Sequence, residues 1–210
     1  MNEKIVIIKL NIGNYNSISR CLNKLNINHI ISDSNEDIVS ADKIILPGIG
    51  SFGPFLKEIF DKKIDQIILS KFSQKKPILG ICVGYQSFFE QSDESSNVKG
   101  LSLLNGKFKK LNFNKQKENN IIQKNHLGWN DVAQIKKNII FEGITDKSDF
   151  FFNHGYMLTS YQNDYIYGTT NFNSNFPSVV NKDKLYGVQF HPEKSQKNGL
   201  LILKNFCEKC

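Results

Sequence analysis

The sequence has few of the residues that mark a nucleic-acid-binding or membrane protein. Arg20 is the only arginine among 27 basic residues, so the formal net charge of +7 comes almost wholly from lysine. Arginine forks that read base edges and aromatic motifs that stack on RNA bases are therefore missing. No apolar run approaches the roughly 20 residues that a membrane-spanning helix needs. We expect neither nucleic acid nor a membrane as a partner.

Cysteine is also scarce, with only Cys21, Cys82, Cys207 and Cys210. A cytosolic chain of this length needs no disulfide framework. Cys207 and Cys210 have C-x-x-C spacing, but a zinc site needs two more ligands, and we interpret the pair as part of a frayed helix end. The apolar run near the N-terminus is too short and too early for a signal peptide, so we expect a cytoplasmic protein.

The chain has 210 residues, of which 40% are hydrophobic. That size and composition predict a single domain over residues 1–210. The first half alternates apolar, β-branched runs with segments whose apolar residues have helical spacing, which favours a parallel sheet covered on both faces. Strands are predicted over 3–10, 27–32, 41–48 and 76–82, and helices over 17–25, 55–60 and 64–72.

The second half consists mostly of short extended runs, and we expect it to add an antiparallel section to the edge of the sheet. The runs are 106–113, 150–156, 165–172, 177–182 and 184–190. The Lys/Asn-rich stretch 109–120 is predicted to be a solvated hairpin tip, and a last helix is predicted over roughly 199–208.

Cys82 lies in the stretch GICVG (residues 80–84), between an apolar strand and a helix expected over 84–90. Small glycines on both sides let strand and helix approach closely around a sharp turn, which is the geometry of a nucleophile elbow. A helix N-terminus at that point favours the reactive thiolate. The alternative is a buried, unreactive cysteine, the commoner case. The stretch alone does not decide between them.

His191 and Glu193 follow the last extended run, with Pro192 between them. A thiolate nucleophile needs a base within hydrogen-bond reach, and the base needs an orienting group. Side chains at i and i+2 of an extended segment point the same way, and the fixed φ of proline stiffens the segment. A lone histidine at a strand end is usually structural, and spacing does not show that His191 meets Cys82. The pattern nevertheless predicts a base and its orienting carboxylate.

The stretch LPGIGSFG (residues 46–53) follows another predicted strand. It lacks the Gly-Lys-Ser/Thr ending of a P-loop, and its glycine spacing misses the dinucleotide-binding pattern. We interpret it as a backbone loop that supplies one N–H group of an oxyanion hole, with the N–H of Val83 as the other.

Together, LPGIGSFG, GICVGYQ (80–86) and HPEKS (191–195) resemble the class I, or triad, glutamine amidotransferases. More narrowly, the chain is similar to the glutaminase subunits of imidazole glycerol phosphate synthases, through GWN (128–130), residues 151–156 with His154, and the stretch 186–206. The resemblance covers almost the whole chain. It implies a flavodoxin-like α/β fold with a mixed, mostly parallel sheet, flanking helices and an antiparallel extension.

The resemblance further implies hydrolysis of glutamine to glutamate and ammonia by a triad of Cys82, His191 and Glu193. Cys82 attacks the side-chain amide and forms a thioester, His191 shuttles protons, and Glu193 orients His191. No cofactor and no metal are implied. Substrate-site positions carried over from the family are Gly50 and Val83 in the oxyanion hole, Gln86 as a residue that holds glutamine, and Glu94 near the substrate ammonium.

The implied partner is a (β/α)8-barrel synthase subunit, which forms a heterodimer with the glutaminase and receives its ammonia through a dry channel. There the ammonia serves the synthesis of imidazole glycerol phosphate in histidine biosynthesis. The sequence departs from the family pattern at Lys9-Leu10-Asn11, at Asn125 and at Gly155. Two alternatives therefore stay open: a paralogous glutaminase that supplies ammonia for amidino sugars of surface polysaccharides, and a catalytically silent flavodoxin-like binding module.

Overall fold

The computed structural model describes residues 3–111 and 125–210. The first half of the chain alternates strands and helices, as the apolar periodicity predicts. Its elements are β1 (Ile5–Ile8), α1 (Tyr15–Lys24), β2 (Ile30–Ser32), α2 (Asn35–Ser40), β3 (Lys43–Gly48), α3 (Phe52–Asp61), α4 (Ile64–Ser73), β4 (Ile78–Cys82) and α5 (Val83–Gln86).

The second half is largely extended and ends in a helix. Its strands are β5 (Gln91–Ser92), β6 (Gly106–Lys110), β7 (His126–Gln134), β8 (Ser148–His154), β9 (Tyr156–Tyr161), β10 (Ile166–Phe172), β11 (Ser174–Lys182) and β12 (Leu185–Val188). The helical elements are the 3-10 turns η1 (Asp93–Ser95), η2 (Ile139–Phe141) and η3 (Pro192–Lys194), and helix α6 (Gln196–Lys209).

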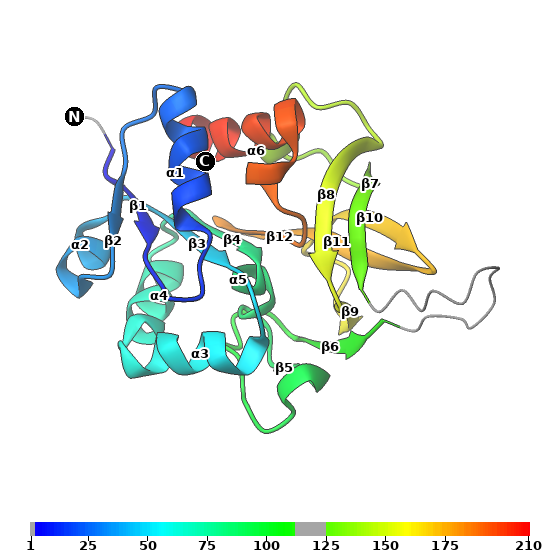
Figure 1. Cartoon of the computed structure of the whole chain (residues 1–210), viewed down its shortest axis with the longest axis horizontal. Helices are drawn as coiled ribbons and strands as arrows, with labels where there is room; N and C mark the ends of the chain where they lie inside the picture. The colour runs from blue at the N-terminus through cyan, green and yellow to red at the C-terminus, as the bar shows by residue number, and fades with distance from the viewer. Residues whose placement is uncertain (1–2, 112–124) are drawn as a thin grey trace.

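One mixed sheet organises the molecule (Figure 1). Its strand order is β2-β1-β3-β4-β12-β11-β10-β7-β8, and a smaller sheet pairs β5, β6 and β9. The strands from β2 to β12 are parallel, whereas β11, β10, β7 and β8 continue the sheet in antiparallel pairing. The predicted parallel α/β core with an antiparallel extension is confirmed.

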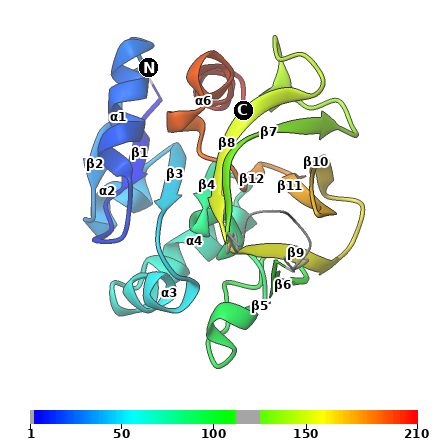
Figure 2. The same ribbon diagram turned by 45° about the vertical axis from the view of Figure 1, so that its right-hand side comes forward.

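Helices cover both faces of the parallel part (Figures 1 and 2). α1 and α6 lie together on one face, and α3 and α4 lie on the other. Because β1, β3, β4 and β12 are buried along their whole length, their β-branched and apolar side chains fill the space between sheet and helices. This double burial explains why these strands read as continuous apolar runs.

The register of three neighbouring parallel strands brings separate sequence motifs to one edge of the sheet. Gly48 at the end of β3 pairs with Cys82 at the end of β4. On the other side of β4, Ile81 pairs with Val188 at the end of β12. The loops that follow all three strands therefore meet at their carboxyl ends, where open α/β sheets bind ligands.

Some sequence predictions need correction. The helix expected over 84–90 ends at Gln86, because the carbonyls of residues 87–89 accept N–H groups from residues 101–104 instead of continuing a helix. The C-terminal helix is not frayed: α6 continues to Lys209, and Cys207 is buried in the core. Helix α2 was not predicted. The predicted hairpin tip over 109–120 lies mostly outside the described residues.

Across residues 3–111 and 125–210, no helix combines the length and the apolar character needed to cross a membrane.

Candidate active site

Cys82 occupies a strained turn between β4 and α5. Its backbone has φ of 55° and ψ of −110°, in the left-handed half of the map that a cysteine rarely adopts. A Cβ placed on Gly84 would lie 2.1 Å from the carbonyl oxygen of Leu46, and one on Gly80 would lie 2.5 Å from the ring of Phe88. The two glycines are therefore required for the close approach of strand and helix, as the elbow prediction proposed. Strain of this kind is characteristic of functional sites.

His191 and Glu193 follow β12 and form a buried pair. Nδ1 of His191 lies 2.9 Å from Oε1 of Glu193, and both side chains are at most 2% exposed. A carboxylate only accepts hydrogen bonds, so Nδ1 carries the proton and Nε2 is left for another partner. The predicted contact is present, but its predicted cause is wrong, because Glu193 lies in the 3-10 turn η3 and not in an extended segment.

The charges of this pair are coupled to Cys82. Burial by itself lowers the pKa of His191, but the charge of Cys82 and hydrogen bonds to Cys82 and Glu193 outweigh burial and raise that pKa to about 10. Burial raises the pKa of Glu193, yet the hydrogen bond and charge of His191 overcome this and hold it below its ordinary value. The arrangement thus favours a protonated imidazole at His191, held against the ionised carboxylate of Glu193.

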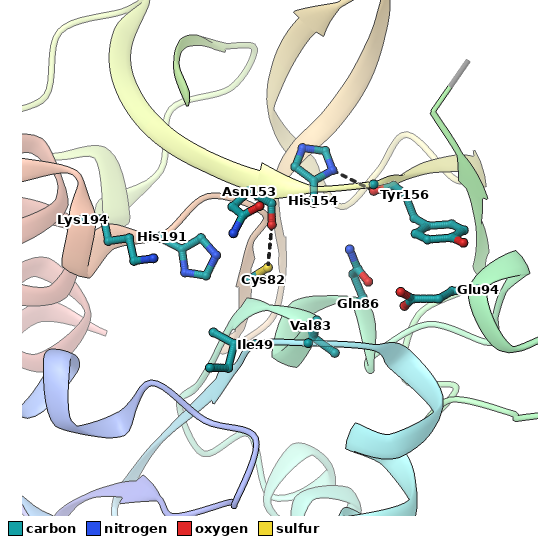
Figure 3. Close-up of a pocket in the computed structure, with 12 residues that line it drawn as sticks. Ile49, Cys82, Val83, Gln86, Glu94, Asn153, His154, Tyr156, His191 and Lys194 are labelled. Atoms are coloured by element: carbon teal, nitrogen blue, oxygen red, sulfur yellow. Dashed lines mark hydrogen bonds between the residues drawn. The ribbon is translucent and has the colours of Figure 1, made fainter. Parts of the chain in front are cut away.

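A small pocket opens at these side chains (Figure 3). Its volume is about 70 Å³, far below the 300–1,000 Å³ that is typical of sites for drug-sized ligands. Cys82 and His191 lie on one side of it, and Glu94 and Tyr156 lie on the other (Figure 3). The sulfur of Cys82 approaches the carbonyl oxygen of Asn153 to 3.9 Å. The pocket suits one short polar side chain beside the sulfur.

All four predicted substrate-site residues, Gly50, Val83, Gln86 and Glu94, line this pocket. Gly50 has φ of +87°, a backbone conformation that favours glycine. The carboxylate of Glu94 accepts the backbone N–H of Phe52 at 2.7 Å, which ties η1 to the start of α3. The individual roles of these residues in holding a substrate remain predictions.

Two buried histidines lie next to each other at the pocket wall, and one of them, His154, lines the pocket. Nδ1 of His154 contacts the carbonyl of Tyr156 at 2.8 Å, so Nδ1 carries the proton and Nε2 accepts from Nδ1 of His126 at 3.0 Å. Burial lowers the pKa of His126 to about 4, and burial together with the charge of His126 lowers that of His154 to about 3. Both rings are neutral at pH 7 and fix the strand end that carries Asn153.

Comparison with known proteins assigns this chain to a family. The family model described as glutamine amidotransferase class-I matches residues 6–210. The chain belongs to this family. It is 40% identical to "Imidazole glycerol phosphate synthase subunit HisH 1" of Methanococcus maripaludis and 40% identical to the subunit HisH of Methanocaldococcus jannaschii. Each alignment covers 97% of this chain and 98% of the relative.

Solved structures agree with the assignment of the fold. A crystal structure described as a glutamine amidotransferase superposes with a TM-score of 0.72 at 16% identity, covering 96% of this chain and 98% of that one. The structure of PurLQS from Thermotoga maritima gives a TM-score of 0.69 at 18% identity, covering 98% of both chains. This chain therefore has the class-I amidotransferase fold.

Sequence reasoning about this amidotransferase missed two polar residues at the site. Asn14, at the start of α1, donates from Nδ2 to Oε1 of Glu193 at 2.8 Å. Gln189 is completely buried and donates from Nε2 to the sulfur of Cys82 at 3.8 Å. A signal for Gln189 was present: it is a polar residue two positions before His191 at the end of an otherwise apolar strand.

Proposed function

We propose that this chain is the glutaminase subunit of an imidazole glycerol phosphate synthase. The observation that supports it most directly is the strained Cys82 elbow, placed in one small pocket with the His191–Glu193 pair. Relatives of nearly the same length carry that subunit's name. The proposed reaction is hydrolysis of glutamine to glutamate and ammonia, with no cofactor.

The chemistry follows from three side chains. The Cys82 thiolate attacks the side-chain amide carbon of glutamine and forms a tetrahedral intermediate. His191 gives its proton to the leaving nitrogen, so ammonia departs and a thioester remains. Water then attacks the thioester while His191 takes its proton, and glutamate leaves as the thiolate is restored. Glu193 holds His191 in the required tautomer and stabilises its cationic form.

Backbone N–H groups complete the proposed site. The N–H of Val83 follows the nucleophile directly, and the peptide between Ile49 and Gly50 lies in the neighbouring loop. Both segments line the pocket, which supports an oxyanion hole formed by these groups. In the same proposal, Gln86 and Glu94 hold the amino-acid end of the substrate.

The free ammonia is used by a partner subunit, which we propose is a (β/α)8-barrel synthase. An exposed apolar strip beside the pocket supports this. On β7, Leu127 and Trp129 are 58% and 48% exposed. Leu127 pairs across the sheet with Asn153, whose carbonyl contacts Cys82, and Trp129 pairs with Phe151. A partner docked on this strip would cover the pocket and keep ammonia out of bulk water.

Labelling with a glutamine-analogue diazo-ketone tests the proposed nucleophile. Burial raises the pKa of Cys207 to about 12 and raises those of Cys21 and Cys210 above the ordinary value, so these thiols are poor nucleophiles at neutral pH. We expect mass spectrometry to find the adduct on Cys82 alone. Absence of the adduct, with the partner present, would exclude the enzyme and favour a silent binding module.

A reconstitution assay tests the partner. Glutaminase activity is measured with a histidine-pathway barrel subunit and its nucleotide ligand, and we expect stimulation. In the same complex, Cys82→Ala should abolish glutamine-dependent synthesis while added ammonium restores it. If the wild-type chain hydrolyses glutamine but this barrel does not stimulate its glutaminase activity, the enzyme that uses the ammonia is a different one, such as one that makes amidino sugars.

A further inference from the structure

Gln189 lies at a junction between the nucleophile and the substrate pocket. It directly follows β12, its side chain is completely buried, and its backbone N–H donates to the carbonyl of Ser178 at 2.9 Å. The parallel pairing of β12 with β4 places it beside the strand that ends at Cys82. A buried amide needs hydrogen-bond partners for both its oxygen and its nitrogen, so the partners of Gln189 indicate its role.

Both ends of the Gln189 amide have a partner. Its Oε1 accepts from Nε2 of Gln86 at 3.0 Å, and its own Nε2 points to the sulfur of Cys82 at 3.8 Å. Because Gln86 donates to the oxygen, the orientation of the Gln189 amide is fixed with its N–H group toward the sulfur. Gln86 is itself almost fully buried and lines the pocket.

The sulfur therefore has two kinds of hydrogen-bonding neighbour. The carbonyl of Asn153, at 3.9 Å, only accepts and can serve only the protonated thiol. The Gln189 amide donates, and a donor stabilises an anionic acceptor much more than a neutral one. His191 balances the charge of the thiolate, whereas Gln189 is an uncharged donor that does not take part in proton transfer.

We propose that Gln189 is a further catalytic residue, which stabilises the Cys82 thiolate by a direct amide hydrogen bond, and that Gln86 acts as a positioning residue that fixes the orientation of this amide. The proposal deepens the proposed glutaminase function and rests on it. It assigns Gln86 two connected tasks, since its oxygen stays available to the pocket while its nitrogen orients Gln189. Occupation of the pocket and the reactivity of the sulfur are thereby linked through two amides.

Alkylation of Cys82 by iodoacetamide across pH tests the proposal without requiring turnover. Gln189→Met keeps the length and volume of the side chain but removes the donor. We expect the midpoint of its pH–rate profile for Cys82 alkylation to rise by about one unit, so that the rate at pH values below the midpoint falls roughly tenfold, as loss of one hydrogen bond to a charged group predicts. Gln189→Glu should shift the midpoint further, because a carboxylate repels the thiolate.

Other titratable groups around the sulfur are unchanged in these variants. His191 faces it from the connection after β12, and Glu94, His154, Tyr156 and Lys194 line the rest of the pocket. Cys21, on α1, serves as an internal control in the same sample, since its alkylation should be unaffected. Gln86→Met should raise the midpoint of the Cys82 pH–rate profile by a smaller amount. In that variant Gln189 still has its N–H donor, but nothing from Gln86 holds the amide in its orientation.

The outcomes separate this inference from the proposed function. A folded Gln189→Met protein with the wild-type pH profile for Cys82 would overturn the role of Gln189, even if glutaminase activity fell. If Gln189→Met does not fold, the shift expected for Gln86→Met decides instead, and its absence overturns the proposal. A shifted profile in a chain that hydrolyses no glutamine would refute the proposed function and leave the role of Gln189 standing.

Discussion

The carboxylate of Glu193 is held by two donors on the same oxygen. Asn14 donates to Oε1 from 2.8 Å, and His191 lies 2.9 Å from the same atom. The second oxygen, Oε2, is buried without a hydrogen-bond partner among the described residues. Besides His191, the amide of Asn14 at the start of α1 therefore helps to set the position of this carboxylate.

Replacing Asn14 should consequently weaken the proposed triad. Asn14→Leu removes a hydrogen bond to a buried charge and should lower the free energy of unfolding by about 2 kcal/mol. Asn14→Asp places a second anion beside Glu193 and should reduce glutamine hydrolysis further than Asn14→Leu does. Steady-state kinetics and urea unfolding measure both effects. Asn16→Asp, on an exposed position of the same helix, is the matched control. Equal activity in all variants would contradict the positioning role.

The high pKa of His191 should depend on the charge of Cys82. Burial alone would lower this pKa, and the thiolate is the first of the groups that raise it to about 10. In Cys82→Ala, we therefore expect the pKa of His191 to fall, followed by NMR of the imidazole nitrogens. Cys21→Ala is the control and should leave the pKa of His191 unchanged. An unchanged value in Cys82→Ala would mean that Glu193 alone sets the charge of His191.

The His191–Glu193 pair contributes to the free energy of unfolding, and the sign of its pH dependence follows from the two pKa shifts. The folded pKa of His191 lies above its unfolded value of about 6.5, so its contribution is fully present below that pH and is lost as pH rises toward about 10. Glu193 has a lowered pKa and acts in the opposite direction, losing its contribution in acid. We expect His191→Gln to flatten the alkaline limb of a plot of unfolding free energy against pH. An alkaline limb identical to that of the wild type would contradict this assignment.

Much of the fold could be predicted from the local sequence pattern. Strands that are covered on both faces of the sheet consist mainly of continuous apolar residues, and this holds for β1, β3, β4 and β12. The elbow was also predictable, since the glycines that it requires flank Cys82 directly. Helix α2 was missed because it is short and buries only Ile38. The short length of α5 follows from hydrogen bonds to residues 101–104, which no local pattern records.

Asn14 and Gln189 were missed because their contacts at the site join residues that are far apart in the sequence. Asn14 contacts Glu193 across 179 positions, and Gln189 contacts Cys82 across 107. Their environments are created by the order of strands in the sheet. The His191–Glu193 contact was predicted because it is local, although a 3-10 turn and not an extended segment produces it.

Gly84→Ala should test the elbow itself. The added Cβ would meet the backbone oxygen of Leu46 at 2.1 Å, and a backbone atom in a sheet cannot move aside cheaply. We expect a loss of about 3 kcal/mol in the free energy of unfolding and loss of diazo-ketone labelling at Cys82. Gly13→Ala is the comparator, since its nearest contact is 3.3 Å. If both variants behave alike, close packing at Gly84 is not what shapes the turn.

The buried pair of His126 and His154 should make the protein sensitive to mild acid. Their pKa values of about 4 and about 3 lie below the ordinary 6.5, so the unfolded chain binds protons that the folded chain does not. Stability should therefore fall as pH drops from about 6.5 toward 4, and each histidine adds up to about 1.4 kcal/mol per pH unit. His126→Gln should reduce this slope by about one proton in urea unfolding between pH 4.5 and 6.5. His29→Gln, at a half-buried position outside the pair, is the comparator. Equal slopes in the His126 variant and the wild type would show that His126 takes up its proton without unfolding of the chain.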